Sequence, residues 1–257
     1  MIQTTSSTLL DRSRLVGLLM ELSTTKLNSA EYNLAERLSY LIGVQGSINL
    51  ARTLQQLPNS IAAGTTDNSL SLQDDVLTSC REMVSTITSG FTTTSTSDAT
   101  TDLQLIVPSA CHTLRAQVLQ TYEPYRRFYS AHQTEMGVGL QALRQRVRAR
   151  LANTSVELHQ LVELDIALDD NLAPHTRRLF NVIPKLLEQR FHLLLKTHKE
   201  NVDDNNDELE NWLAPDGWLE LFYQDLRELL LAEFDVRLQP ILGLLEALNE
   251  QTEHNHD

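Results

Sequence analysis

The sequence predicts an all-α fold: a multi-helix bundle with a small N-terminal three-helix unit and a long C-terminal helix. Leucine recurs at spacings of three and four along most of the 257 residues, which is the period of an amphipathic helix and not of a strand. Only nine glycines and seven prolines are present. We therefore expect roughly seven to nine helices, a count read from this spacing, and almost no sheet.

The N-terminal residues 1–57 have the pattern of a compact three-helix unit. Leucines share one helical face over residues 9–24, and Asn28 with Glu31 forms a capping box for a second helix. That helix is predicted to end at Gly43, and a third is predicted to end by Leu57, because Pro58 disfavours helix in the residue before it.

Residues 58–101 are predicted to form a helix with flexible, Ser/Thr-rich flanks. Turn residues gather over 59–68 and a low-complexity run covers 92–101. Between them an apolar stripe extends from Leu72 to Ile87.

Residues 102–250 are predicted to form the main helical bundle. Helices are expected to begin near Pro108 and Pro124, because proline is tolerated in a first turn. The second of these continues through Leu151, with a stop and a new cap at 153–155. The next helix carries an apolar stripe of Leu158, Leu161, Leu164, Leu168 and Leu172.

A further helix is expected from Pro174 to Lys199, with Pro184 either kinking or splitting it. An acidic, exposed loop over 200–211 follows. After the turn at 215–217, apolar residues at alternating threes and fours predict one long helix through Leu248, and residues 251–257 are expected to be a disordered tail. The buried stripe includes Phe234, which we expect to be a core residue.

The stretch from Tyr122 to Leu151 is the best candidate for a partner-binding surface. It combines clustered aromatic residues with six arginines in an otherwise acidic chain. Tyrosine and arginine are enriched at interface hot spots, although aromatic residues at helical spacing also form core faces. The predicted partner-binding residues are Tyr125, Arg126, Arg127, Arg144, Arg146, Arg148 and Arg150.

Charge is distributed unevenly along the chain, whose formal net charge is −13. Residues 115–199 hold 13 basic and 8 acidic residues, whereas residues 200–257 hold 2 and 16. This central basic island could dock an acidic protein segment, phosphate groups or nucleic acid, or its arginines could pair with the acidic C-terminal helix and loop. Nucleic acid ranks below protein, because the net charge opposes approach to phosphates.

No motif indicates an enzyme, a cofactor or a metal. GxSxG, GxxxxGK[ST], HExxH and GxGxxG do not occur, and Cys80 and Cys111 match no zinc spacing. His132 with Glu135 is the one acid/base pair that keeps an enzyme of unknown class as an alternative. We expect a non-enzymatic protein without cofactor.

No membrane insertion is expected either. The N-terminal apolar run is interrupted by Asp11, Arg12 and Arg14, and no apolar stretch reaches the length of a membrane span. These features predict a cytoplasmic protein.

Three blocks of the chain resemble a bacterial family of uncharacterised all-helical proteins. They are residues 34–54 (LAERLSYLIGVQGSINLARTL), 123–136 (EPYRRFYSAHQTEM) and 218–248. Genes of that family tend to neighbour those of MotA/TolQ/ExbB-type proton-channel and OmpA-like peptidoglycan-binding proteins. The resemblance therefore implies a cytoplasmic accessory of an ion-driven envelope complex, whose partner would be the cytoplasmic tail of the channel protein. It implies no catalytic residues.

Overall fold

The computed structural model describes residues 14–24, 69–91, 118–201 and 209–254. Within these ranges every regular element is a helix and there is no strand, which confirms the all-α prediction. The helices predicted for residues 28–57 and near Pro108 lie outside the described residues, as do the flanks 59–68 and 92–101.

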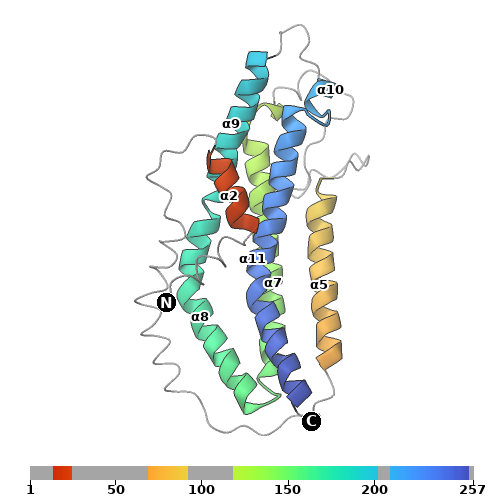
Figure 1. Cartoon of the computed structure of the whole chain (residues 1–257), viewed down its shortest axis with the longest axis vertical. Coiled ribbons are helices and arrows are strands. Elements are labelled where there is room, and N and C mark those ends of the chain that lie inside the picture. Colours follow the sequence, from red (N-terminus) through yellow and green to blue (C-terminus); the bar gives the residue numbers. More distant parts are fainter. Residues whose placement is uncertain (1–13, 25–68, 92–117, 202–208, 255–257) are drawn as a thin grey trace, which may run out of the picture. The chain divides into compact units, whose positions relative to one another are not determined.

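Figure 1 shows the described helices with their labels. They are α2 (Arg14–Thr24), α5 (Ser69–Ser89), α7 (Glu123–Leu151), α8 (Val156–Phe180), α9 (Ile183–Asn201), α10 (Leu209–Trp212) and α11 (Trp218–His254).

The ends of α7 follow local rules that the sequence displays. Pro124 occupies its first turn, where the missing N–H has no intrahelical partner to lose. After α7 ends, the Oγ of Ser155 accepts a hydrogen bond from the backbone N–H of Leu158 at 3.2 Å, so Ser155 is the N-cap of α8. Both the predicted start near Pro124 and the predicted cap are confirmed.

The helix predicted to start at Pro174 is wrong. Pro174 lies inside α8, which continues to Phe180. Residues 181–182 form a turn between α8 and α9. Pro174 is exposed, and so is Asp170, the residue four positions earlier whose backbone carbonyl loses its helical hydrogen bond, so water can replace that bond and the helix continues. Pro184 then sits in the first turn of α9, which confirms the splitting alternative.

The C-terminal helix is long, as predicted. α11 contains 37 residues and passes through Pro240, so it extends about 55 Å at 1.5 Å per residue. Its apolar stripe is buried, including Phe222, Leu230 and Phe234. The helix includes residues 251–254, which were predicted to belong to a disordered tail.

The α8 stripe differs from the prediction. Leu158 is buried, but Leu168 is 36% exposed, and the buried positions are instead shared by Val162 and Asp165. The reason lies in α7, whose arginines bind Asp165, as described below.

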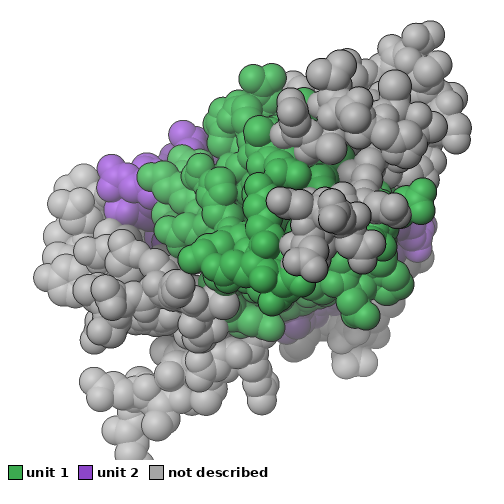
Figure 2. Space-filling model, turned by 90° about the horizontal axis from the view of Figure 1, so that it is seen from above, with its two compact units in different colours: residues 1–27, 83–136, 181–234 green, residues 28–82, 137–180, 235–257 purple. Residues whose placement is uncertain are grey.

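The chain forms two compact units, coloured separately in Figure 2. Unit 1 comprises residues 1–27, 83–136 and 181–234, and unit 2 comprises residues 28–82, 137–180 and 235–257. The helices α5, α7 and α11 each continue from one unit into the other. The predicted linear boundaries at 57/58 and 101/102 fall outside the described residues and stay predictions.

Unit 1 is built around aromatic side chains from α7, α9 and α11. Tyr125 lies 5.3 Å from both Phe191 and Phe222 between ring centroids, and Phe191 lies 5.5 Å from Trp218. Edge and tilted contacts of this kind add to the free energy gained by burying apolar area. The hydroxyl of Tyr122 also donates to the backbone carbonyl of Pro184, which joins the start of α7 to that of α9.

Candidate functional site

The seven residues predicted to bind a partner fall into two groups. Tyr125 is 1% exposed, and the side chains of Arg144 and Arg148 are 13% and 11% exposed. The exposed group consists of Arg126, Arg127, Arg146 and Arg150. The stretch from Tyr122 to Leu151 therefore contributes both buried side chains and exposed positive charges.

Tyr125 belongs to the interior of unit 1. Its hydroxyl donates a hydrogen bond to the backbone carbonyl of Leu119 at 3.0 Å, and burial raises the pKa of the phenol well above its usual range. A phenol in this setting stays neutral and holds the segment before α7 against the aromatic core. It is not available at the surface.

Arg144 and Arg148 form an ion-pair network with two acids of α8. Arg144 Nε lies 3.0 Å from Asp165 Oδ2, and its Nη1 lies 2.8 Å from Asp169 Oδ1. Arg148 Nε lies 2.7 Å from Asp165 Oδ2, and its Nη2 lies 3.2 Å from Asp169 Oδ2. Two guanidinium groups and two carboxylates thus balance one another in a largely buried site of unit 2.

This network answers one question that the sequence left open. Arg144 and Arg148 do pair within the chain, with α8; among the described residues of the acidic C-terminal segment neither arginine has an ion-pair partner. A sequence signal existed: Asp165 and Asp169 are four residues apart, as are the two arginines, so each pair occupies one helical face.

Arg126 and Arg127 are exposed and bind a neighbour on their own helix. Glu123 accepts hydrogen bonds from Arg126 at 2.8 Å and from Arg127 at 3.0 Å. These two hydrogen bonds, that from Arg126 first, lower the pKa of the Glu123 carboxyl to about 2. The carboxylate also lies in the first turn of α7, where negative charge is favourable.

Arg146 and Arg150 are the exposed arginines in the second half of α7. Arg146 Nη2 donates to Ser79 Oγ of α5 at 2.9 Å, and in the part of the chain that the structure describes Arg146 forms no ion pair. Arg150 forms no ion pair with any residue in the described ranges. Four residues apart on one helix, the two guanidinium groups lie on the same face.

His132 and Glu135 do not form an acid/base pair at the surface. His132 is 1% exposed, and its ring centroid lies 4.5 Å from that of Phe128, whereas Glu135 is exposed. Among the described residues there is also no group of side chains arranged to hold a metal ion.

A buried carboxylate links α7 to α11 in unit 1. Glu233 is 0% exposed, and its Oε2 accepts hydrogen bonds from the Tyr129 hydroxyl at 3.0 Å and from Gln133 Nε2 at 2.8 Å. Hydrogen bonds of this kind are needed because an unsatisfied buried carboxylate would be strongly destabilising. Sequence reasoning missed Glu233, since nothing local marks it as buried.

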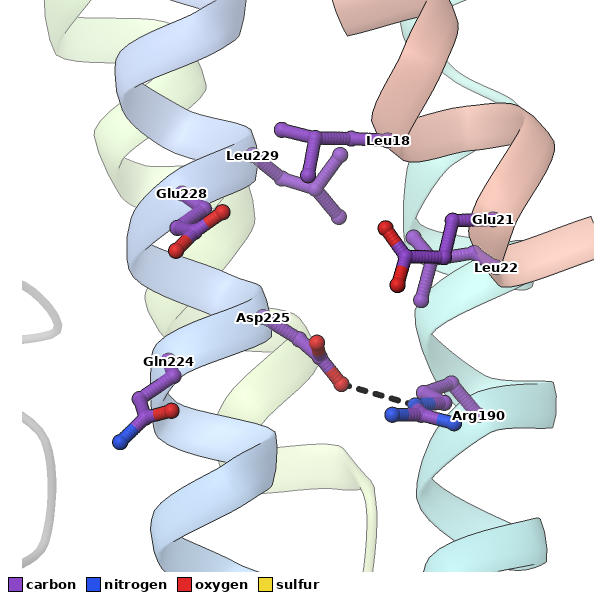
Figure 3. Close-up of a pocket in the computed structure, with 8 residues that line it drawn as sticks. All are labelled: Leu18, Glu21, Leu22, Arg190, Gln224, Asp225, Glu228 and Leu229. Atoms are coloured by element: carbon purple, nitrogen blue, oxygen red, sulfur yellow. Dashed lines mark hydrogen bonds and ion pairs between the residues drawn. The ribbon is translucent and has the colours of Figure 1, made fainter.

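A surface pocket in unit 1 was also missed, because three separate segments build it. Figure 3 shows the residues that line it. They are Leu18, Glu21 and Leu22 of α2, Arg190 of α9, and Gln224, Asp225, Glu228 and Leu229 of α11. The view shows Asp225 pointing toward Arg190, and the Nε of Arg190 lies 2.8 Å from Asp225 Oδ2.

The electrostatics of this pocket are dominated by Asp225. Burial is the largest cause of its raised carboxyl pKa, and the nearby negative charges of Glu21 and Glu228 add to the increase. The hydrogen bond from Arg190 opposes these effects. Carboxylates from α2 and α11 therefore lie in this pocket together with the guanidinium group of Arg190.

No described helix is both long enough and apolar enough to cross a membrane. Comparison with curated proteins and with solved structures gave no match. A family model described as a protein of unknown function, DUF3348, matches residues 1–250. Because that match covers nearly the whole chain, the protein belongs to the DUF3348 family, an uncharacterised family as the sequence resemblance implied.

Proposed function

We propose that this protein is a non-enzymatic interaction protein that binds an acidic segment of a partner protein through Arg146 and Arg150 on α7. The proposal rests on a contrast between two pairs of arginines on the same helix. Arg144 and Arg148 are neutralised by Asp165 and Asp169, whereas Arg146 and Arg150 present their charges to solvent. Exposed cationic groups on a rigid helix can recognise carboxylates through charge-assisted hydrogen bonds.

Two other classes have weaker support. An enzyme using His132 and Glu135 would need both side chains in one concave site, and here one is buried and the other exposed. A nucleic-acid-associated protein would have to approach phosphates with a net charge of −13.

We extend the proposal to a cytoplasmic accessory of an ion-driven envelope complex, in which the acidic segment belongs to the cytoplasmic tail of a MotA/TolQ/ExbB-type channel protein. Its support is the resemblance to a family whose genes we expect to neighbour those of such channels. The cytoplasmic location is part of this proposal.

The test is an affinity pull-down from the native cell with identification of captured proteins by mass spectrometry. The double variant Arg146→Glu and Arg150→Glu is compared with wild type and with a control that reverses the exposed pair Arg177 and Arg178 of α8. Both variants change the net charge equally, so only the position of the reversed charges differs.

We expect the α7 variant to lose the partner and the α8 control to retain it. Melting temperatures should barely differ, because exposed charges contribute only ~0–1 kcal/mol each. Salt near ~0.5 M should weaken wild-type capture by screening. Equal capture of the partner by both variants would refute the arginine site. Capture of a protein other than a channel subunit would refute only the assignment to an envelope complex. Loss of capture after nuclease treatment would favour nucleic acid instead.

A further inference from the structure

One pair of arginines on α7 shows how this helix recognises carboxylates. The inner pair, Arg144 and Arg148, binds Asp165 and Asp169 of α8, with N–O distances of 2.5–3.2 Å. Each arginine contacts both carboxylates. The arginines are four residues apart and so are the aspartates, which is about 6 Å along a helix. The inner pair therefore binds an acidic helix whose charges match its own spacing.

A second pair of arginines repeats this spacing on the same helix. The outer pair, Arg146 and Arg150, is displaced by two positions from the inner pair. Each residue turns an α-helix by about 100°, so the displacement rotates the outer pair by about 200°, away from α8. Both of its side chains are exposed, and within the described ranges neither forms an ion pair.

The surface around the outer pair suits the approach of another helix. Ala142 and Ala149, which neighbour Arg146 along the helix surface, are both exposed and small. Arg146 is also held in place, because its Nη2 donates to Ser79 Oγ of α5 at 2.9 Å. That bond uses one of the five N–H donors of the guanidinium group. A side chain that is already restrained loses less conformational entropy when a partner binds.

Electrostatics favour two carboxylates at this surface. Like charges four residues apart on a helix repel each other, so the outer pair carries a repulsion that bound carboxylates would relieve. Hydrogen bonds between guanidinium and carboxylate groups are stronger than those between neutral groups. To contact both arginines at once, the two carboxylates must lie about 6 Å apart on one side of the partner, as they do four residues apart on a helix.

We infer that the acidic segment bound by the outer pair is an α-helix that carries two carboxylates four residues apart on one face. This inference rests on the proposed function and narrows the partner from an acidic segment to an acidic helix. Its support is the charge complementarity of the exposed outer pair, together with α8, whose Asp165 and Asp169 have this pattern and bind the inner pair.

The test is an NMR titration of the full chain with three synthetic alanine-rich peptides of equal length and charge, followed on the arginine Nε–H signals. The first peptide is stapled into a helix and has two aspartates four residues apart. The second is stapled in the same way, with its aspartates two residues apart on nearly opposite faces. The third is unstapled, also with aspartates two residues apart, which lie on one side of an extended chain.

We expect the first peptide to bind roughly 10-fold more tightly than either of the others, because only its carboxylates match the outer pair on a helical surface. The double variant Arg146→Glu and Arg150→Glu should lose this binding. It should instead bind a stapled peptide with two lysines four residues apart, a rescue that a purely structural effect of the substitutions would not produce. The matched control, Arg177→Glu with Arg178→Glu on the exposed surface of α8, should bind the first peptide as wild type does.

Equal binding of the three peptides, or tighter binding of the unstapled one, would overturn the helical partner. So would the absence of binding by the first peptide, or binding that persists in the outer-pair variant. The pull-down with the same variant decides the proposed function separately, since loss of the native partner there would keep the arginine site even if the helical partner fails. Circular dichroism establishes that each variant is folded.

Discussion

At the scale of single residues, Gly217 shows how closely the chain packs before α11. A Cβ at this position would lie 2.2 Å from the carbonyl oxygen of Trp212 and 2.5 Å from that of Asn211. Both are backbone atoms, which cannot rotate away as a side chain can. The tight turn predicted at 215–217 therefore requires glycine for the close approach of α10, and the Gly217 N–H donates to the Ala214 carbonyl at 2.7 Å.

Gly217→Ala should lower the free energy of unfolding by about 1–3 kcal/mol, the usual cost of forcing an extra carbon into a packed site. The matched control is Gly243→Ala in α11, where a Cβ would meet nothing within 4 Å. That substitution should stabilise the protein by about 0.5–1 kcal/mol, because alanine loses less backbone entropy than glycine when it enters a helix. Urea unfolding measures both, and a neutral Gly217→Ala would show that the turn can relax.

At the scale of elements, the pairing of α7 with α8 depends on ionic side chains as well as on leucines. Asp165 is 8% exposed and contacts both Arg144 and Arg148, so it is the centre of the network. This explains why α8 turns Val162 and Asp165 inward and leaves Leu168 partly exposed. Such networks are costly to break, since removing one partner leaves buried charge uncompensated.

Asp165→Ala should therefore destabilise the protein by about 3–5 kcal/mol. Asp170→Ala is the control, because Asp170 is exposed on the same helix and its removal should change stability by less than ~0.5 kcal/mol. Chemical denaturation of the two variants gives the comparison. Similar small losses for both would mean that the network contributes little.

A second prediction at this scale concerns the long helix α11. Phe234 is 3% exposed on its apolar stripe, so Phe234→Ala should cost about 3–5 kcal/mol through lost burial and an unfilled cavity. Val236, two residues further and 36% exposed, is the control, and Val236→Ala should cost much less. A loss below ~1 kcal/mol at Phe234 would contradict a core role for this stripe.

At the scale of the whole molecule, the net charge of −13 is the dominant electrostatic feature. Self-repulsion of like charges disfavours the compact state, and salt screens exposed charges while hardly affecting buried pairs such as that of Arg148 with Asp165.

Raising NaCl from ~0.02 to ~0.2 M should therefore increase the melting temperature, because the Debye length falls below ~10 Å. A gain of ~1 kcal/mol corresponds to about 2–4 °C for a chain of this size. Differential scanning fluorimetry is sufficient for the measurement. A fall in melting temperature would mean that favourable exposed pairs outweigh the repulsion.

The sequence by itself determined the features that depend on neighbours along the chain. Helical periodicity, the proline in the first turn of α7, the Ser155 cap and the turn before α11 are all set by local backbone and side-chain geometry. These residues were identified correctly because their partners lie within four positions. The long apolar stripe around Phe234 was found for the same reason.

Only the tertiary structure decided which charges remain at the surface. Arg144 and Arg146 look alike in sequence, yet the first meets Asp165 across 21 positions and the second faces solvent. Likewise Tyr125 is buried by rings from α9 and α11, and the pocket at Asp225 needs three segments. Burial and ion pairing are properties of long-range contacts, whose free energies depend on desolvation and geometry that residue spacing does not encode.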